Sequence, residues 1–152
     1  MKTILINGKL VIFACGMIFS MFGWANAQSC KMDATLTPSG INIPKKIVPA
    51  KEYQVDVTVK NSGTCTWEPS SKIRLSIKIV RGPSGSAVQR DELTPIVELK
   101  YKVEPGKSQP FHYTIEGPYY LGSYTLEWVM VVNNKPFGNE EKKIIEVVAP
   151  NK

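Results

Sequence analysis

The stretch Val57-Thr-Val-Lys-Asn-Ser-Gly-Thr-Cys-Thr-Trp67 decides the fold of this chain. Its first residues alternate apolar and polar side chains, which is typical of a strand with one buried face. Asn61-Ser-Gly63 then predicts a tight turn, and a cysteine and a tryptophan follow the turn. Nothing in the stretch activates a nucleophile, so it indicates architecture and not catalysis.

The first 27 residues have the pattern of a secretory signal peptide. Two early lysines make the start basic, residues 10–24 are almost wholly apolar, and Ala25-Asn26-Ala27 fits a small-x-small cleavage site. We therefore expect cleavage before Gln28 and an exported chain, either periplasmic or released. An uncleaved membrane anchor is one alternative, although about 15 apolar residues are fewer than a spanning helix needs. A lipoprotein modified at Cys15 is another.

Removing this segment leaves a mildly basic chain. The sequence has 19 basic and 13 acidic residues, and two of the basic ones lie before residue 28, so the remainder carries 17 against 13, or +4. The densest lysine pairs are Lys45-Lys46 and Lys142-Lys143, and no basic run is interleaved with aromatic residues as in a nucleic-acid groove. We expect a solvated surface and no nucleic-acid partner.

Cysteine usage predicts one disulfide. Cys15 leaves with the signal peptide, so an exported chain keeps only Cys30 and Cys65, which allow a single intramolecular pairing. Closing a loop of about 35 residues contributes roughly 3 to 4 kcal/mol in the chain-entropy model. Metal binding is the competing interpretation, but His112 is the only histidine and a closed site needs four ligands. We expect no metal and no cofactor.

Residues 28–152 fit one domain without internal repeats. Their apolar side chains recur almost everywhere with period two. The strands that we expect are, in chain order, 33–36, 53–60, 73–79, 96–103, 109–116, 124–132 and 143–148. Asn133-Asn134 turns one hairpin. About seven strands at this spacing predict an immunoglobulin-like antiparallel β-sandwich, with a small barrel as the alternative.

Gly122-Ser-Tyr124 favours the sandwich over the barrel. A tyrosine at the start of a late strand, just after a glycine-bearing corner, resembles the tyrosine corner of Greek-key sandwiches, in which the hydroxyl binds a backbone group. An ordinary core tyrosine is the alternative. Trp128, four residues further on, points to the same face of the strand and is expected in the core.

Further motifs support a resemblance to a known family. They are Cys30-Lys-Met-Asp33, Pro49-Ala-Lys51, the opening stretch, Val103-Glu-Pro-Gly106, Gly117-Pro118, Gly122-Ser-Tyr124 with Trp128, and Phe137-Gly138. Together they resemble the four-tryptophan (FW) domain, the immunoglobulin-like central module of the Nbr autophagy receptor, which also occurs in exported bacterial proteins. The resemblance covers nearly the whole chain after the signal peptide.

The resemblance implies a family-motif core, and it implies the same disulfide. The core residues are Asn61, Gly63, Trp67, Gly122, Tyr124, Trp128, Phe137 and Gly138. In similar exported domains a cysteine near the start pairs with the one before the tryptophan, which here gives Cys30 with Cys65. Two tryptophan positions carry Val57 and Lys142-Lys143 instead, so the resemblance implies a fold and no ligand.

The residues predict no catalytic site, and we expect no enzyme. His112 alternates with apolar neighbours, so it is expected on the exposed face of a strand and not as a general base. The adjacent carboxylates Asp91-Glu92 and Glu140-Glu141 lie in charged, turn-rich stretches where solvated side chains are usual. Gly82-Pro-Ser-Gly85 lacks the Lys-Ser or Lys-Thr of a phosphate-binding loop.

These features favour an exported, non-catalytic interaction module that presents loops or a sheet face to another protein or to a surface polysaccharide. Candidate contacts are the connection Gly82–Thr94, the hairpin Asn133-Asn134-Lys135 and the outward face near Val129 and Val131. Both faces of the strand are apolar there, and a strand covered on both sides is the alternative explanation.

Two rival functions stay open. A carbohydrate-binding module needs exposed aromatic side chains in a flat row, for which the chain has Tyr119-Tyr120 and Phe137. A structural subunit of a surface assembly needs an unpaired strand edge or a free extension.

Overall fold

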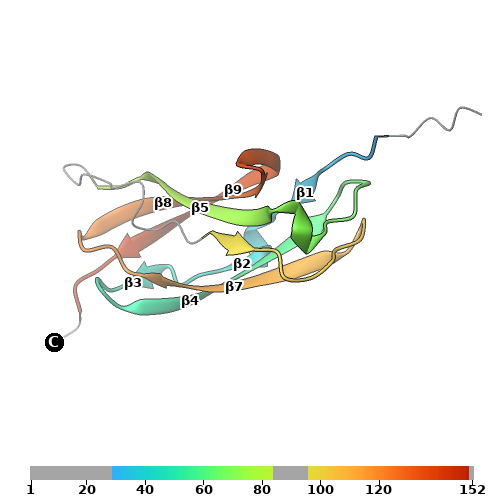
Figure 1. The fold of residues 1–152 in the computed structure, drawn as a ribbon. Coiled ribbons are helices and arrows are strands. Elements are labelled where there is room, and N and C mark those ends of the chain that lie inside the picture. The colour runs from blue at the N-terminus through green and yellow to red at the C-terminus, as the bar shows by residue number, and fades with distance from the viewer. Residues whose placement is uncertain (1–28, 84–95, 151–152) are drawn as a thin grey trace, which may run out of the picture.

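The fold is an all-β sandwich of two facing sheets, as the computed structural model shows (Figure 1). The structure describes residues 29–83 and 96–150, so the predicted signal peptide and most of the Gly82–Thr94 connection lie outside it. The first sheet holds β1 (Ala34–Thr35), β2 (Ile41–Asn42), β4 (Glu52–Asn61) and β7 (Ser108–Glu116). The second holds β3 (Lys46–Ile47), β5 (Ile73–Arg81), β6 (Val97–Glu98), β8 (Gly122–Val132) and β9 (Lys135–Val147). The predicted sandwich class is therefore confirmed.

The first strand region passes from one sheet to the other. β1 and β2 pair with β4, whereas β3 pairs with β9 in the parallel direction. We expected one strand at 33–36 and antiparallel pairing only, so the strands within residues 41–47 and their parallel ladder correct that expectation. A 3-10 turn at Pro38–Gly40 interrupts the segment and leaves each piece two residues long, which is too short for alternation to reveal.

Alternating side chains fill the space between the sheets as predicted. Val55, Val57 and Val59 of β4 are buried, and they face the buried residues of β5 and β8. Val57, at a position where the resemblance led us to expect a tryptophan, is thus a core residue. Sandwich cores of this kind gain their stability from apolar area removed from water, about 25 cal/mol per Å².

The Asn133-Asn134 turn joins β8 to β9. Both asparagines have left-handed backbones, with φ of 50° and 63°, which fits the type I′ turn of a two-residue hairpin. β9 starts at Lys135, eight residues before the strand that we expected at 143–148. A register shift opposite Trp128–Met130 breaks the alternation of β9 around Gly138, which hid its first half from sequence analysis.

The segment expected as a strand at 96–103 forms only partly. Val97 and Glu98 pair with β5, and Val103 makes a separate bridge to Trp67. Between them the exposed residues 100–102 leave the second sheet as the chain crosses towards β7. The connection between sheets therefore replaces the middle of the predicted strand.

Replacing Gly138 by alanine should destabilise the fold more than replacing Gly106. Both glycines have positive φ, +76° and +80°, so both variants carry a left-handed penalty of roughly 1–2 kcal/mol. A new Cβ at Gly106 meets nothing within 4 Å, whereas at Gly138 it lies 2.3 Å from the Ala34 carbonyl oxygen. We expect Gly138→Ala to lose roughly 1–3 kcal/mol more in urea unfolding. Equal losses would contradict the close approach of β9 to β1.

Candidate functional site

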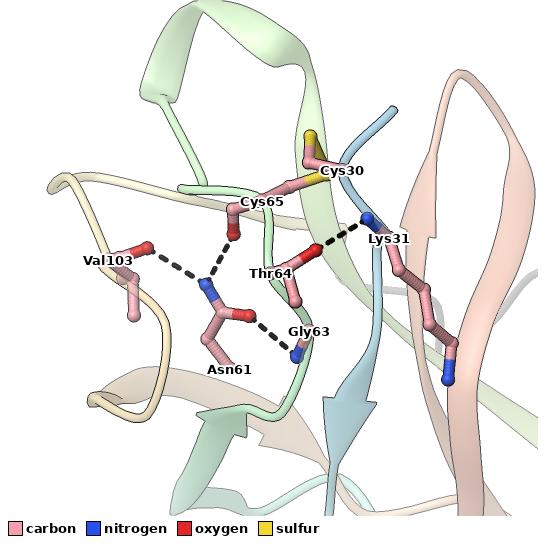
Figure 2. Close-up of a disulfide and its surroundings, with 7 residues drawn as sticks. All are labelled: Cys30, Lys31, Asn61, Gly63, Thr64, Cys65 and Val103. Carbon is pink, nitrogen blue, oxygen red and sulfur yellow. Dashed lines mark hydrogen bonds between the residues drawn. A yellow bond between two sulfur atoms is a disulfide. The ribbon is translucent and has the colours of Figure 1, made fainter. Parts of the chain in front are cut away.

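Cys30 and Cys65 form a disulfide at one end of the sandwich (Figure 2). Their Cα atoms are 4.9 Å apart, within the usual range for a bridged pair. Beside the bridge, Lys31 N donates to Thr64 Oγ1 at 2.8 Å, and the Lys31 carbonyl accepts from Thr64 N at 2.9 Å. A Cβ on Gly63 would lie 2.3 Å from the Lys31 oxygen, so this contact requires glycine. These contacts form a structural joint, by which we mean the links between residues 30–31 and the turn at residues 63–65.

Asn61 is the polar centre of this joint, although it is completely buried. Its Nδ2 donates to the carbonyls of Cys65 at 2.8 Å and Val103 at 3.0 Å, and its Oδ1 accepts from Gly63 N at 3.1 Å (Figure 2). All three partners are backbone groups, and of these the Val103 carbonyl also accepts from Trp67 N at 2.9 Å. The signal in the sequence is an asparagine at an inward position, two residues after Val59.

The two motif tryptophans are core residues and present no face to a ligand. Trp67 is fully buried, its ring meets Phe137 edge-on with centroids 5.7 Å apart, and its backbone exchanges two hydrogen bonds with Val103. Trp128 is also fully buried, as predicted, and its Nε1 donates to Tyr113 Oη at 2.6 Å. Burial raises the pKa of Tyr113, so this hydroxyl stays protonated.

Asn139 is a bridging residue that sequence analysis missed. Its Oδ1 accepts from Leu36 N at 2.7 Å and its Nδ2 donates to Leu36 O at 3.0 Å. The Asn139 side chain therefore makes the same two hydrogen bonds with Leu36 that the backbone of a neighbouring strand would make. Gly138, with no side chain, lets β9 approach Ala34 closely enough for this.

The predicted tyrosine corner is present at the opposite end of the sandwich. Tyr124 is buried, and its Oη donates to the Tyr120 carbonyl at 2.9 Å. Gly122, with φ of +132°, precedes it and lies against Pro83. The Tyr124 hydroxyl thus holds the backbone of the loop before β8 in place.

This fixed loop carries large exposed side chains. Tyr119 is 67% exposed, Tyr120 61% and Leu121 54%. The Tyr119 hydroxyl donates to Glu116 Oε1 at a long 3.4 Å. We call residues 119–121 the aromatic loop. Exposed apolar and aromatic side chains that lie next to one another mark candidate interaction surfaces.

The aromatic row considered for a carbohydrate-binding module does not form. The aromatic loop lies where the start of β8 pairs with the end of β9, Gly122 with Val147. Phe137 pairs with Met130 near the far end of β8, and it is half-buried against Trp67. The two sets of rings therefore lie at opposite ends of the sandwich.

The outward face near Val129 is closed. Val129 is 2% exposed and Val131 is half-buried, so the strand is covered there and is not a free binding face. Next to them the Glu127 carboxylate, 7% exposed, lies 3.1 Å from Lys78 Nζ and 3.0 Å from Lys142 Nζ. Burial alone raises the pKa of Glu127, but hydrogen bonds from the two lysines outweigh it, and the pKa falls below its ordinary value.

The other sequence candidates are exposed side chains. The hairpin residues Asn133, Asn134 and Lys135 are in water, and Arg74 hydrogen-bonds Asn134. His112 is 66% exposed, as predicted, with Nδ1 2.6 Å from Asp56 Oδ1 on the outer face of the first sheet. Asp91-Glu92 lies outside the described residues. Within the described residues, 29–83 and 96–150, no group of three His, Cys, Asp or Glu side chains could hold a metal ion.

No family model and no curated protein matches the chain. A solved structure titled as AvmM, which catalyses macrocyclization in alchivemycin A biosynthesis, matches with a TM-score of 0.50 and 10% identity over 80% of this chain and 91% of AvmM. At that identity the likeness shows the fold alone.

Two further solved structures match more loosely. One is a β-glucosidase from Listeria innocua in complex with gluconolactone, at TM-score 0.46 and 12% identity over 78% of this chain. The other is the sporulation control protein Spo0M from Bacillus subtilis, at TM-score 0.37 and 16% identity over 81%. The chain spans 16% of the β-glucosidase and 50% of Spo0M.

Replacing Asn61 by alanine should strongly destabilise the fold. The change leaves the Cys65 carbonyl and the Gly63 amide without their Asn61 partner and removes one of two donors from the Val103 carbonyl, and each unsatisfied buried group costs about 1–3 kcal/mol before relaxation. We expect the free energy of unfolding to fall by roughly 2–4 kcal/mol in urea titration. Asn42→Ala, at an exposed position of β2, is the control. A similar small loss in both variants would contradict the role of Asn61.

Glu127 should stabilise the fold at neutral pH and not in acid. Because its folded pKa lies below the ordinary value of 4.5, its contribution is complete above about that pH and is lost as the pH falls through the folded pKa. Unfolding free energy measured by urea from about pH 7 to about pH 3 should therefore drop less in Glu127→Gln than in the wild type. Glu104→Gln, at an exposed carboxylate, should follow the wild-type profile. Parallel profiles for all three proteins would refute this.

Proposed function

We propose that this chain is an exported, non-catalytic, FW-type binding module that contacts a partner protein through the aromatic loop. The observation that carries the proposal is the exposure of Tyr119, Tyr120 and Leu121 on a backbone fixed by Tyr124. Tyrosine is enriched at the energetic centres of protein interfaces because it combines a large apolar body with a polar tip. A fixed backbone lowers the conformational entropy lost on binding.

Export is supported by the signal-peptide pattern and by the disulfide. Disulfides persist in oxidising compartments and are rare where thiols are kept reduced. The Cys30–Cys65 bridge closes a separation of 35 residues in a small domain. In the described part of the chain, no helix is long and apolar enough to cross a membrane.

A binding role is supported over catalysis by the surroundings of the single histidine. His112 and Asp56 lie side by side on the outer face of the first sheet, where His112 borders a hollow of about 300 Å³ and the two side chains are 66% and 49% exposed. Water screens such a pair, whereas acid–base catalysis needs an oriented set in a water-excluding site. The neighbouring cross-strand pair is Gln54 with Thr114, which is not an activated nucleophile.

The test uses a photo-crosslinking amino acid at Tyr120 in the exported chain, with the same group at Tyr101 as the matched control. Tyr101 is 67% exposed but lies beside β6 and β7, away from the aromatic loop. We expect a specific protein adduct from envelope extract at Tyr120 only. For the purified partner, Tyr119→Ser with Tyr120→Ser should weaken the Kd by at least about thirtyfold without lowering Tm.

Two results would count against the proposal. An adduct of equal yield at Tyr101 would mean that the aromatic loop is not the contact. Thermal stabilisation by a surface polysaccharide, with no protein adduct at either position, would favour the carbohydrate-binding alternative. Tyr119 and Tyr120 would then be the sugar-stacking rings, without Phe137.

A further inference from the structure

The fold brings the two densest lysine pairs of the sequence to one place. Residues 43–45, between β2 and β3, and residues 142–145 of β9 border a hollow of about 400 Å³. Its lining residues are Ile43, Lys45, Lys142, Lys143, Ile144 and Ile145. Lys45 and Lys143 are far apart in the chain, and sequence analysis treated these lysines as scattered surface charge.

Two of the lysines have no carboxylate partner in the part of the chain that the structure describes. Lys142 is neutralised by Glu127, but among the described residues Lys143 Nζ donates to the Ile41 carbonyl alone, at 2.5 Å, and Lys143 is half-buried. Neither Lys143 nor Lys45 lies within ion-pair distance of an acidic group in residues 29–83 and 96–150. An ammonium has three donors, so Lys143 keeps two for a ligand. A partly desolvated charge without a counter-charge is costly, and an anion would offset that cost.

A backbone amide faces the same side. Glu146 N donates to the Lys45 carbonyl at 2.8 Å where β3 joins β9. Because amides alternate along a strand, the Ile144 amide, two residues earlier, points to this side, where β3 has ended. An amide N–H beside two ammonium groups is a suitable donor set for one phosphate or carboxylate.

The rest of the hollow is apolar. Ile43 and Ile145 are buried in its floor, and Ile144, 68% exposed, forms its rim. Small-ligand sites combine such an apolar lining with a few placed polar groups. A fully hydrated inorganic anion would leave this lining unused.

We propose that this hollow binds a small organic anion, with its phosphate or carboxylate on Lys45 and Lys143 and a short apolar body on Ile43 and Ile144. The site lies on the flank of the sandwich and does not depend on the aromatic loop. Lysines at a strand edge also discourage edge pairing between molecules, and that role alone predicts no ligand.

The test is a titration of the exported chain with hexyl phosphate, hexanoate, inorganic phosphate and hexanol, followed by amide NMR shifts. We expect saturable shifts at Ile144 with one or both organic anions, and binding at least about tenfold weaker in Lys45→Gln and in Lys143→Gln. Glutamine at 143 keeps a hydrogen-bond donor without the charge, and Lys45→Gln leaves the contact of Lys143 with the Ile41 carbonyl intact. Lys60→Gln, which removes an exposed charge from β4, should bind as the wild type does.

The remaining probes separate the sources of affinity. Hexanol should not bind, and inorganic phosphate should bind at least about tenfold more weakly than hexyl phosphate because it lacks the apolar body. Equal weakening in Lys60→Gln, or no shift at Ile144 with either organic anion, would overturn the proposal. Binding to phosphatidylglycerol vesicles without binding of the soluble probes would also overturn it, since it would indicate a membrane surface as the ligand.

Discussion

The closed sandwich depends on one constraint: the N-terminal segment, residues 30–47, must be attached to both sheets. Its strands β1, β2 and β3 are two residues long, so ladder hydrogen bonds alone hold it weakly. Separate links supply the rest: the Cys30–Cys65 bridge at its start, Asn139 on Leu36, and Lys143 on the Ile41 carbonyl. Buried Asn61 then ties the turn that carries Cys65 to the loop at Val103.

Sequence patterns predicted what local chemistry determines. Alternation located the long strands, the Asn133-Asn134 pair located the hairpin, and cysteine counting gave the disulfide. Long-range geometry was not predictable. The parallel pairing of β3 with β9 and the reach of Asn139 to Leu36 join segments about a hundred residues apart, and β9 also carries a bulge against its neighbour β8. A bulge interrupts the very period on which strand prediction relies.

The candidate surfaces were predicted less well than the fold. Apolar residues on both faces of β8 are compatible with a binding face and equally with a strand covered on both sides. The burial of Val129 shows that the strand is covered there. The aromatic loop was considered only as part of a row with Phe137, because distance along a strand cannot be judged before register is known. Lys45 and Lys143 line the same hollow because of the register of β9. No local pattern in the sequence indicates this.

The two ends of the sandwich have different physical characters. At the disulfide end, buried Asn61 hydrogen-bonds three backbone groups and Trp67 is covered, whereas the opposite end exposes Tyr119 to Leu121 on a fixed backbone. Backbone amide hydrogen exchange, before and after reduction of the disulfide under native conditions, tests this division most directly. Exchange should accelerate at Thr64, Cys65 and Ala34 while the amides of residues 119–124 keep their rates. Equal acceleration at both ends, or none at Thr64 and Cys65, would contradict the account.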